Sequence, residues 1–396
     1  MRILLVGTLP PELGSKNYGG VARVVWNLAK TLKKNGSDVT IGGIGKYYKK
    51  YQQKSGIDIY GIGFSLFVLL EASFLMVRQI PAIEIHSFSL RHLYKLFYSV
   101  YYLLYLNKRV EFDIIHVHHV TNQIPYAVKL TGLNVKVIST IHSYSSLVND
   151  ELKREKENIN IQLKQSDYIT HVSEHLKNIG IRKGIKWESS SEVIYNGVQS
   201  INNETRHNTD PVQVCFVGSV TRNKGIDRLI ACLNHVGKSK DLELVIVGRG
   251  DYEKTIRDNV DKYNYKVTLT GQLNNTLAIE TIAKASVLVN PSKSESFGLV
   301  YLESLGAGTP VIGYKPLIEE FISYFGIGKS SLKRWLISYD YHTESSEELA
   351  DKILKILEIK SSNTYQSERI KIIEMVKSNF NWNKIACEYS KLYIEI

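Results

Sequence analysis

Cysteine is nearly absent from this chain. Only three occur in 396 residues, and they lie far apart, at Cys215, Cys232 and Cys387. That spacing provides neither a disulfide framework nor the closely spaced thiolates that hold a metal ion. It is typical of a protein kept in a reducing compartment, so we expect a cytoplasmic location.

Long apolar runs are missing as well. A membrane-spanning helix requires about 20 predominantly apolar residues, and the apolar segments at residues 64–77 and 90–106 both fall short. The apolar run at residues 1–7 is too short for a signal peptide and predicts a buried strand. In residues 90–106 a helical stripe is open to two interpretations, core packing or a surface facing a lipid-linked acceptor. The stripe consists of Leu90, Leu93, Tyr94, Phe97, Val100, Tyr101 and Leu104.

Acidic residues are scarce in the first part of the chain. Residues 1–110 contain five Asp or Glu against fifteen Lys or Arg, which accounts for +10 of the net charge of +11. Such a basic region favours an acidic partner, for example an anionic membrane surface; the alternative is a general effect on solubility. Four lysines interspersed with tyrosines, Lys46, Lys49, Lys50 and Lys54, are the predicted contact of a peripheral protein. Nothing in the sequence predicts a nucleic-acid partner.

Short β-branched segments alternate with helical patterns along the chain, which favours parallel sheets built from βαβ units. The strands expected in the first half are residues 2–6, 38–41, 113–117, 136–140, 168–172 and 192–194. Those expected in the second half are residues 212–217, 243–247, 266–270, 287–289 and 311–312. A polar stretch at residues 199–208 predicts a linker. We therefore expect two doubly wound α/β domains, 1–203 and 204–379, that face a central cleft, and a final helix at 380–396.

Two carboxylates flank the stretch that is most informative about function. Glu295 lies in a loop after an expected strand, and Glu303 lies eight residues later in a helical pattern, so both approach one face. Between them the helix begins, where unpaired N–H donors and the positive end of the helix dipole favour anions. The backbone donors available there belong to Phe297, Gly298, Leu299 and Val300. Carboxylates for sugar hydroxyls beside donors for a diphosphate predict a nucleotide-sugar site.

This Glu-x7-Glu pattern, with the Gly-Ala-Gly-Thr-Pro segment at residues 306–310, resembles the signature of the family 4 retaining glycosyltransferases. The resemblance covers nearly the whole chain, and its motifs occur in family order. It implies the GT-B fold of two Rossmann-like domains, in which domain 1–203 lies on the acceptor side, domain 204–379 binds the nucleotide sugar, and the final helix, 380–396, crosses back to the first domain. The resemblance further implies the transfer of a sugar from a nucleotide diphosphate sugar with retention of configuration. It also implies that Glu295 orients sugar hydroxyls and that Glu303 holds the ribose.

Two loops resemble the segments of the family that bind the donor diphosphate. Gly19 and Gly20 open a helix after the first strand, where glycine lets a phosphate approach the backbone closely. Lys224 matches the lysine of the family's Gly-Arg…Lys-Gly loop. The arginine position of that loop is Ser219 here, so Arg222 is the residue that we expect to supply a guanidinium.

A histidine and an asparagine complete the predicted site. His142 ends a strand in a Thr-Ile-His-Ser segment, which resembles the family's Thr-x-His-Asp segment, whose histidine reaches the donor sugar. The resemblance thus implies His142 and Glu295 as the catalytic residues, with Asn196 of an Asn-Gly interdomain turn in the donor site. His116 and His118 lie on one side of a strand without a carboxylate or cysteine set, and Asp-x-Asp occurs nowhere in the chain. Neither a metal ion nor a cofactor other than the donor is implied.

We expect a retaining hexosyltransferase that acts on a glycan or lipid-linked acceptor in bacterial surface polysaccharide synthesis. One alternative is a sugar-nucleotide epimerase with the same GT-B fold. Another is an accessory binding subunit without activity, suggested by Ser219 and by residues 313–320, which depart from the family's glycine-containing loop. Release of free nucleotide only in the presence of an acceptor separates transfer from epimerisation, and donor turnover excludes the accessory subunit.

Overall fold

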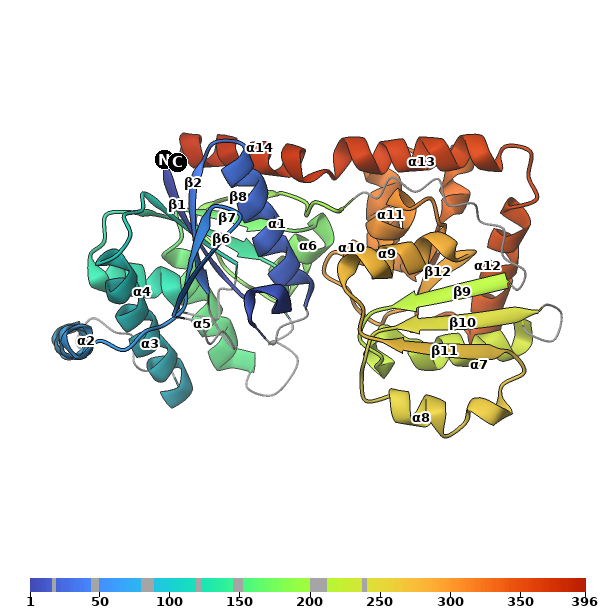
Figure 1. The fold of residues 1–396 in the computed structure, drawn as a ribbon, viewed down its shortest axis with the longest axis horizontal. Coiled ribbons are helices and arrows are strands. Elements are labelled where there is room, and N and C mark those ends of the chain that lie inside the picture. The colour runs from blue at the N-terminus through green and yellow to red at the C-terminus, as the bar shows by residue number, and fades with distance from the viewer. Residues whose placement is uncertain are drawn as a thin grey trace. The chain divides into compact units, whose positions relative to one another are not determined.

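The computed structural model describes residues 1–15, 19–43, 50–79, 89–118, 123–144, 152–199, 212–236 and 241–396. The chain forms two compact units (Figure 1). Unit 1 comprises Met1–Gly197 together with Trp382–Ile396, and unit 2 comprises Val198–Asn381. Among the described residues, no helix is both long enough and apolar enough to cross a membrane.

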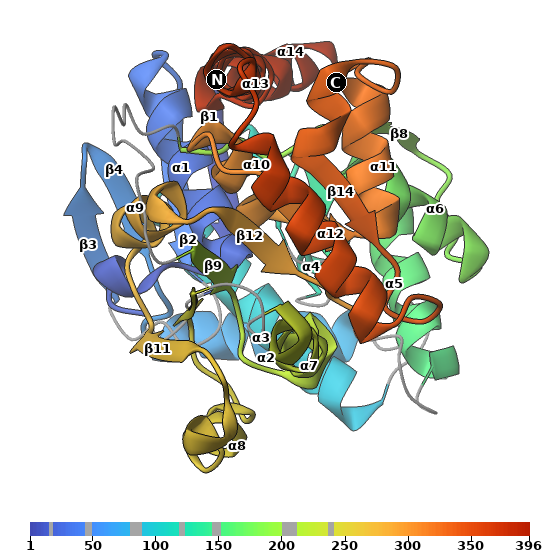
Figure 2. The same ribbon diagram turned by 90° about the vertical axis from the view of Figure 1, so that its right-hand side faces the viewer.

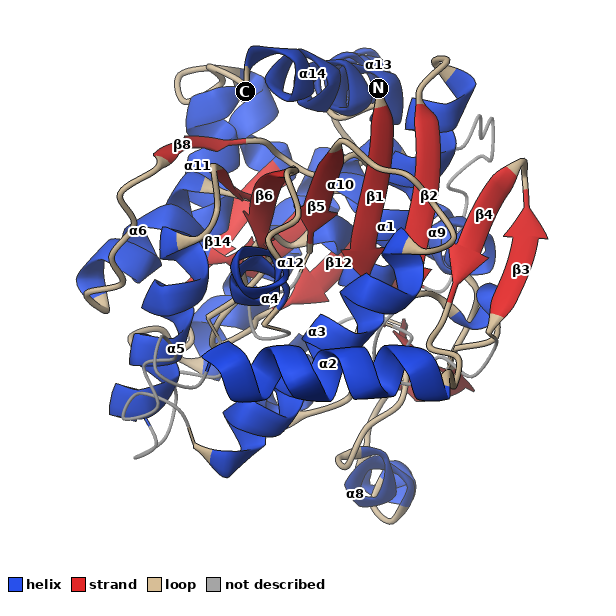
Figure 3. Cartoon of the chain, turned by 90° about the vertical axis from the view of Figure 1, so that its left-hand side faces the viewer, coloured by secondary structure: helices blue, strands red, loops and turns tan. Residues whose placement is uncertain are grey.

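Unit 1 is built on an eight-stranded sheet in the order β3-β4-β2-β1-β5-β6-β7-β8 (Figure 3). The strands are β1 (Arg2–Gly7), β2 (Asp38–Gly43), β3 (Tyr51–Lys54), β4 (Ile57–Tyr60), β5 (Ile114–Val117), β6 (Lys136–Ile141), β7 (Tyr168–His171) and β8 (Ser190–Val193). Every neighbouring pair is parallel except β3 with β4. The order reverses at β1, which pairs with β2 on one side and with β5 on the other. Ligands of such sheets bind at the carboxyl ends of the strands around this reversal.

Helices cover both faces of this sheet. They are α1 (Gly20–Lys34), α2 (Leu66–Gln79), α3 (Leu90–Asn107), α4 (Ile124–Thr131), α5 (Leu152–Lys164), α6 (Glu174–Arg182) and α14 (Trp382–Glu395). Alternate side chains of β1 enter different cores, because successive residues of a strand point to opposite faces. Leu4 and Val6 pack with α3 and α4, whereas Ile3 and Leu5 pack with α1 and α14.

Unit 2 contains a six-stranded, fully parallel sheet in the order β11-β10-β9-β12-β13-β14 (Figure 2). Its strands are β9 (Val212–Val217), β10 (Leu242–Val247), β11 (Lys266–Gly271), β12 (Val287–Asn290), β13 (Val311–Tyr314) and β14 (Leu336–Tyr339). Its helices are α7 (Ile226–Val236), α8 (Glu253–Arg257), α9 (Asn275–Lys284), α10 (Leu299–Gly306), α11 (Lys315–Tyr324), α12 (Ser346–Ile359) and α13 (Tyr365–Asn379). The reversal here lies at β9, between β10 and β12, so the loops after β9 and β12 emerge side by side.

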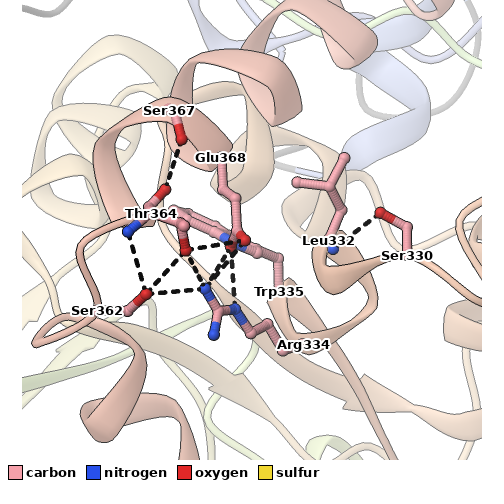
Figure 4. Close-up of polar contacts among 8 residues, drawn as sticks. All are labelled: Ser330, Leu332, Arg334, Trp335, Ser362, Thr364, Ser367 and Glu368. Carbon is pink, nitrogen blue, oxygen red and sulfur yellow. Dashed lines mark hydrogen bonds and ion pairs between the residues drawn. The ribbon is translucent and has the colours of Figure 1, made fainter.

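An ion pair with a buried carboxylate fastens α13 to the 3-10 turn that directly precedes β14 (Figure 4). Two nitrogens of the Arg334 guanidinium donate to Glu368, Nε to Oε2 and Nη2 to Oε1, each at 3.0 Å. The indole Nε1 of Trp335, which is fully buried, donates to the same carboxylate at 2.9 Å. Although burial favours the neutral acid, hydrogen bonds from Trp335, Ser331 and Arg334 outweigh it and lower the pKa of Glu368. Glu368 is therefore held as an anion inside unit 2.

The set of predicted strands lacked β3, β4 and β14. Each has four residues, and β3 is largely exposed and lacks the alternation of apolar and polar residues that marks a half-buried strand. Such short strands exist because a neighbouring strand pairs with them, which local sequence does not encode. Of the predicted membrane-contacting lysines, Lys54 ends β3 and Lys50 directly precedes it, while Lys46 and Lys49 lie outside the described residues.

The apolar stripe predicted in residues 90–106 lies on α3 and divides in two. Val100, Tyr101 and Leu104 are buried in the core of unit 1. At the start of the helix, by contrast, Leu90 is 86% and Tyr94 69% exposed. Core packing thus accounts for the second half of the stripe, and in the first half Leu93 also packs against the core while Leu90 and Tyr94 face outward.

Candidate active site

Unit 2 brings the predicted lysine and one predicted carboxylate into contact. Lys224 Nζ donates to Glu295 Oε1 at 2.6 Å, and Ser292 Oγ donates to the same oxygen at 3.1 Å. Lys224 ends a turn of 3-10 helix after β9, and Glu295 lies between β12 and α10. Because β9 and β12 are adjacent and parallel, their following loops meet at one edge of the sheet. The Lys224 and Glu295 side chains are only 27% and 13% exposed, so solvent screens this pair less than a surface ion pair.

Backbone contacts hold these two loops together. Lys293 N donates to Asn223 O at 2.9 Å. Gly225 has φ of 77°, and a Cβ at this position would lie 2.0 Å from Pro291 O, so only glycine permits the approach. At the end of β12, the Asn290 side chain pairs with the backbone of Val217 at the end of β9. Its Nδ2 donates to Val217 O at 2.8 Å, and its Oδ1 accepts from Val217 N at 3.3 Å. The distance between Lys224 and Glu295 is therefore set by the fold, not by two flexible side chains alone.

The start of α10 is shaped as predicted to present backbone donors. Gly298 is the N-cap residue, with φ of 70°, and no side chain caps the helix. A Cβ on Gly298 would lie 2.4 Å from the ring of Tyr301. Phe297 is buried, with ring centroids 5.8 Å from Phe321 and 6.4 Å from Phe380. Its side chain thus anchors the loop, and the first N–H groups of the helix, including those of Leu299 and Val300, carry its positive dipole end.

Glu303 lies inside α10 and is only 6% exposed. Two residues before it, Tyr301 joins the helix to two strands: its hydroxyl donates to Asn290 O at 3.2 Å and accepts from Tyr314 N at 3.1 Å. Burial raises the pKa of Tyr301 well above its usual value, so this hydroxyl stays neutral. The helix that carries Glu303 is therefore fixed to the carboxyl ends of β12 and β13.

Arg222 is the residue that we expect to supply the guanidinium missing at Ser219 in the diphosphate loop. Both residues are exposed. The Arg222 guanidinium carbon lies 5.5 Å from the ring centroid of Tyr252. The structure thus places the Arg222 cation against an aromatic face at the edge of the same loop system, while Lys224 contacts Glu295.

In unit 1, His142 forms a pair with a second histidine. His142 follows β6 and His118 follows the neighbouring β5. His142 Nε2 and His118 Nδ1 are 3.0 Å apart, and the rings are nearly stacked, with centroids 5.2 Å apart and an interplanar angle of 28°. One of these nitrogens carries the proton that the other accepts. His118 is fully buried and His142 is 9% exposed, so the pair is held with little freedom.

His116, the other histidine of the predicted cluster, has both ring nitrogens in hydrogen bonds. Nδ1 lies 2.7 Å from the Tyr393 hydroxyl of α14, and Nε2 lies 2.6 Å from the Thr140 hydroxyl. Burial, together with the charge of His142, lowers the pKa of His116 to about 3. The ring is therefore neutral at physiological pH and ties α14 to the sheet of unit 1.

The remaining predicted residues of unit 1 lie at backbone turns. Gly19 is the N-cap residue of α1, no side chain caps that helix, and Gly20 is its first residue. The residues immediately before Gly19, 16–18, are not described. Asn196 is 4% exposed, and a Cβ on the adjacent Gly197 would lie 2.6 Å from the Trp382 ring at the start of α14.

Sequence reasoning gave no contact with a predicted catalytic or binding residue to three residues that organise the site. Ser292 shares Glu295 Oε1 with Lys224, Tyr301 holds α10, and His118 contacts His142. Only His118 had a local signal, its place in a histidine-rich strand end. Ser292 acts through a contact three residues along the same loop, and Tyr301 acts through contacts with the ends of β12 and β13.

A hollow of about 1020 Å³ in unit 2 lies apart from these residues. It is lined by α11, β14 and α12 residues, and none of the predicted site residues borders it. Two of the cations that line it are already engaged, because Lys352 donates to Ser338 O at 2.7 Å and pairs with Glu344, and Arg334 pairs with Glu368. The predicted residues, not this hollow, define the candidate site.

Comparison with protein families decides the membership of the chain. The model described as glycosyl transferases group 1 matches residues 198–372, and the model described as glycosyltransferase family 4 matches residues 18–200. The two matches follow one another and leave only the ends of the chain outside. The chain belongs to the family 4 glycosyltransferases. It is an enzyme of the GT-B type, as the resemblance implied.

Individual relatives agree with this assignment. An uncharacterised glycosyltransferase of Methanocaldococcus jannaschii is 25% identical over 336 residues, which cover 76% of this chain and 77% of that protein. The N-acetyl-alpha-D-glucosaminyl L-malate synthase of Bacillus anthracis is 22% identical over 355 residues, covering 83% and 88%. Among solved structures, sucrose-phosphate synthase of Thermosynechococcus elongatus has a TM-score of 0.72 at 18% identity, covering 100% and 98%. This glycosyltransferase therefore has the predicted fold of two Rossmann-like sheets.

Proposed function

We propose that this glycosyltransferase moves a hexose-type sugar from a nucleotide diphosphate sugar to a glycan or lipid-linked acceptor, with retention of configuration. The observation that carries the proposal is the contact of Lys224 with Glu295 beside the uncapped start of α10. A cation, a helix dipole and a carboxylate at one edge of a sheet match the needs of a donor that is anionic at one end and rich in hydroxyls at the other.

Each residue of unit 2 has a proposed task. The Lys224 ammonium and the N–H groups at the start of α10 stabilise the negative charge that develops on the departing diphosphate, where preorganised donors act most strongly. Lys224 has three N–H donors and Glu295 accepts one, so the ammonium holds Glu295 and a phosphate oxygen together. Lys224 and Ser292 both donate to Glu295 Oε1, and Oε2 accepts from the sugar hydroxyls. Glu303 accepts from the ribose hydroxyls.

The proposal extends to unit 1 through His142, which contacts the donor sugar and is oriented by His118. Gly19 and Gly20 bring the uncapped start of α1 to the diphosphate, and Asn196 contributes to the donor site. The acceptor is bound by unit 1. Two structural relatives support a nucleotide-sugar donor: Anabaena HepE, solved in complex with UDP-glucose, has a TM-score of 0.67 at 13% identity, and the lipopolysaccharide outer core galactosyltransferase WaaB has a TM-score of 0.64 at 15% identity.

We further propose that the enzyme works in bacterial surface polysaccharide synthesis, at the cytoplasmic face of an anionic membrane. A relative from Klebsiella pneumoniae, 25% identical over 302 residues, is named for its place in a cps region. The basic balance of residues 1–110 supports attraction to anionic lipid, with Lys50 and Lys54 as contacts and with Lys46 and Lys49 beside them in the sequence.

A two-step experiment tests the proposed reaction. A thermal-shift screen against UDP-, GDP- and dTDP-sugars identifies the donor, because a ligand that binds only the folded state raises the midpoint of unfolding. The selected donor is then incubated with membrane lipid extracts, and the anomeric configuration of the product is read by NMR. Release of free nucleotide only with acceptor, and a product of retained configuration, are expected. Conversion of the donor to its epimer without nucleotide release, or no donor turnover at all, contradicts the proposal.

A further inference from the structure

Helix α2 is apolar on both of its sides, and only one side is covered. Val68 and Ala72 are buried against the core of unit 1. The opposite side is exposed along the whole helix, and Phe64 precedes it with 75% exposure. Leu66 at the start of the helix is 60% exposed, and four further exposed residues form a row that we call the α2 stripe: Phe67 at 70%, Leu70 at 61%, Phe74 at 71% and Val77 at 66%.

The spacing of the α2 stripe shows that it forms one continuous surface. Steps of three, four and three residues keep these side chains on one face of a helix. Figures 1 and 3 show α2 lying outside α3, on the side of α3 away from the sheet. An amphipathic surface helix turns polar residues outward, and a contiguous row of exposed Phe and Leu side chains is typical of an interaction surface.

The charges around the α2 stripe are mostly positive. Residues 64–79 and 89–110 contain five cations, Arg78, Arg91, Lys95, Lys108 and Arg109, and one acid, Glu71. Lys108 Nζ lies 4.1 Å from the ring centroid of Phe67, and it pairs with Glu71 at 2.5 Å. Arg78 follows Val77 directly and is exposed. An apolar row is thus flanked by cations at both of its ends.

We propose that α2 docks on an anionic phospholipid bilayer, lying parallel to its surface with the α2 stripe inserted at the boundary of headgroups and acyl chains. The helix has 14 residues, so about 21 Å of apolar surface contacts the membrane. Charge complementarity selects this occupant. A second copy of the chain would bring the same excess of cations into the contact, whereas anionic headgroups neutralise Arg78 and Lys108 while the acyl chains accept Phe67 and Phe74.

This inference rests on the membrane-surface part of the proposed function and is independent of the sugar chemistry. It differs from docking through the lysines of residues 46–54 in its response to salt. A contact made by lysines alone weakens as salt shortens the Debye length to about 3 Å at 1 M. A contact that buries the α2 stripe retains its apolar part under the same conditions.

The test is flotation of the purified enzyme with vesicles of phosphatidylcholine and phosphatidylglycerol at low and high salt. The variant Phe67→Gln/Phe74→Gln removes the apolar contact, and Ile181→Gln/Ile370→Gln is the matched control, because those residues are 55% and 53% exposed elsewhere. We expect the partition coefficient of the α2 variant to fall at least tenfold at both salt concentrations and that of the control to stay within twofold. Circular dichroism and nucleotide thermal shift verify that the variants are folded.

A second measurement does not depend on weakening the contact. Phe74→Trp places a fluorophore in the α2 stripe, and Ile370→Trp places one on unit 2 as a reference. Vesicles with brominated acyl chains should quench the added fluorescence of Phe74→Trp and leave that of Ile370→Trp unchanged. Equal flotation of the α2 variant and wild type, absence of quenching, or a wild-type dimer that the α2 variant converts to monomer overturns the inference. Binding that 1 M salt abolishes completely assigns the contact to lysines and also overturns it.

Discussion

Lys224 and Glu295, which are 71 residues apart in sequence, share a hydrogen bond of 2.6 Å in unit 2. The sequence motifs suggested separate tasks for them. Lys224 is the cation expected to bind the diphosphate, and Glu295 is the carboxylate expected to orient the sugar. Under the proposed function, this contact couples the two groups that bind opposite ends of the donor. In that proposal a diphosphate that approaches Lys224 also meets the Glu295 carboxylate, and the hydrogen bond from Lys224 fixes the position of that carboxylate.

Replacing either member of this pair should have distinct kinetic effects. Lys224→Ala removes a preorganised donor of the developing diphosphate charge, so kcat should fall about 100-fold or more. Glu295→Gln removes the competing anion, so nucleotide affinity should stay constant or rise while turnover falls. Calorimetry with the free nucleotide and steady-state kinetics measure the two quantities. Wild-type turnover in both variants would disprove the assignment of this pair.

Glu303 should contribute mainly to nucleotide affinity. Glu303→Ala removes a charged acceptor for ribose hydroxyls, worth about 1.5–3 kcal/mol for such a hydrogen bond. The dissociation constant should therefore rise about 10- to 150-fold. Glu319→Ala in α11 is the control, because Glu319 is exposed and outside the predicted site. Equal affinities of Glu303→Ala and the control would remove Glu303 from the ribose site.

Arg222 should partly compensate for the serine at position 219. Arg222→Ala should then raise the donor KM or lower kcat, by less than Lys224→Ala does, because the Arg222 guanidinium lies at the exposed edge of the loop over Tyr252. Ser219→Arg should be tolerated or should improve diphosphate binding, since Ser219 is exposed and a longer side chain finds space. Unchanged KM and kcat in Arg222→Ala would show that its cation faces solvent in the complex as well.

His118 should act by positioning His142. His118→Leu removes the 3.0 Å contact with His142 Nε2 and should lower kcat/KM for the donor sugar while leaving affinity for the free nucleotide unchanged. His118→Asn keeps a polar atom near the position of Nδ1 and should restore part of the loss. His235→Leu in α7 is the control, because His235 is half-exposed and paired with Glu347. Equal losses in His118→Leu and His118→Asn would indicate a packing role instead.

The Glu368 network should make unit 2 sensitive to acid. Because the pKa of Glu368 is lowered in the folded state, its contribution to stability is present above the pKa of the unfolded chain. That contribution is lost as pH falls through the lower folded-state value. Glu368→Gln should therefore be less stable than wild type at pH 7 and approach it in acid, with a difference of about 3 kcal/mol at neutral pH for a buried charged contact. Urea unfolding at several pH values measures this; a pH-independent difference would show that charge is not the cause.

Local sequence patterns determined the fold class and the positions of most elements. The predicted strand at residues 212–217 coincides with β9, and strands such as β6 and β11 differ from prediction by one residue at an end. Buried parallel strands are short β-branched runs between helical patterns, so their signal is contained in neighbouring residues. The spacing of Glu295 and Glu303 across a loop and a helix start was likewise local, and so was Gly298 at the N-cap of α10.

Contacts between distant segments were decided only by the tertiary structure. The bond from Lys224 to Glu295 and that from His118 to His142 exist because adjacent strands deliver their following loops to one edge of a sheet. The pairing that creates β3 and β4 and the exposure of the α2 stripe also depend on the tertiary structure. Whether a strand is paired or an apolar side chain is buried depends on which elements pack against it. Sequence therefore specified the chemistry of the residues, and the fold specified which of them meet and which face outward.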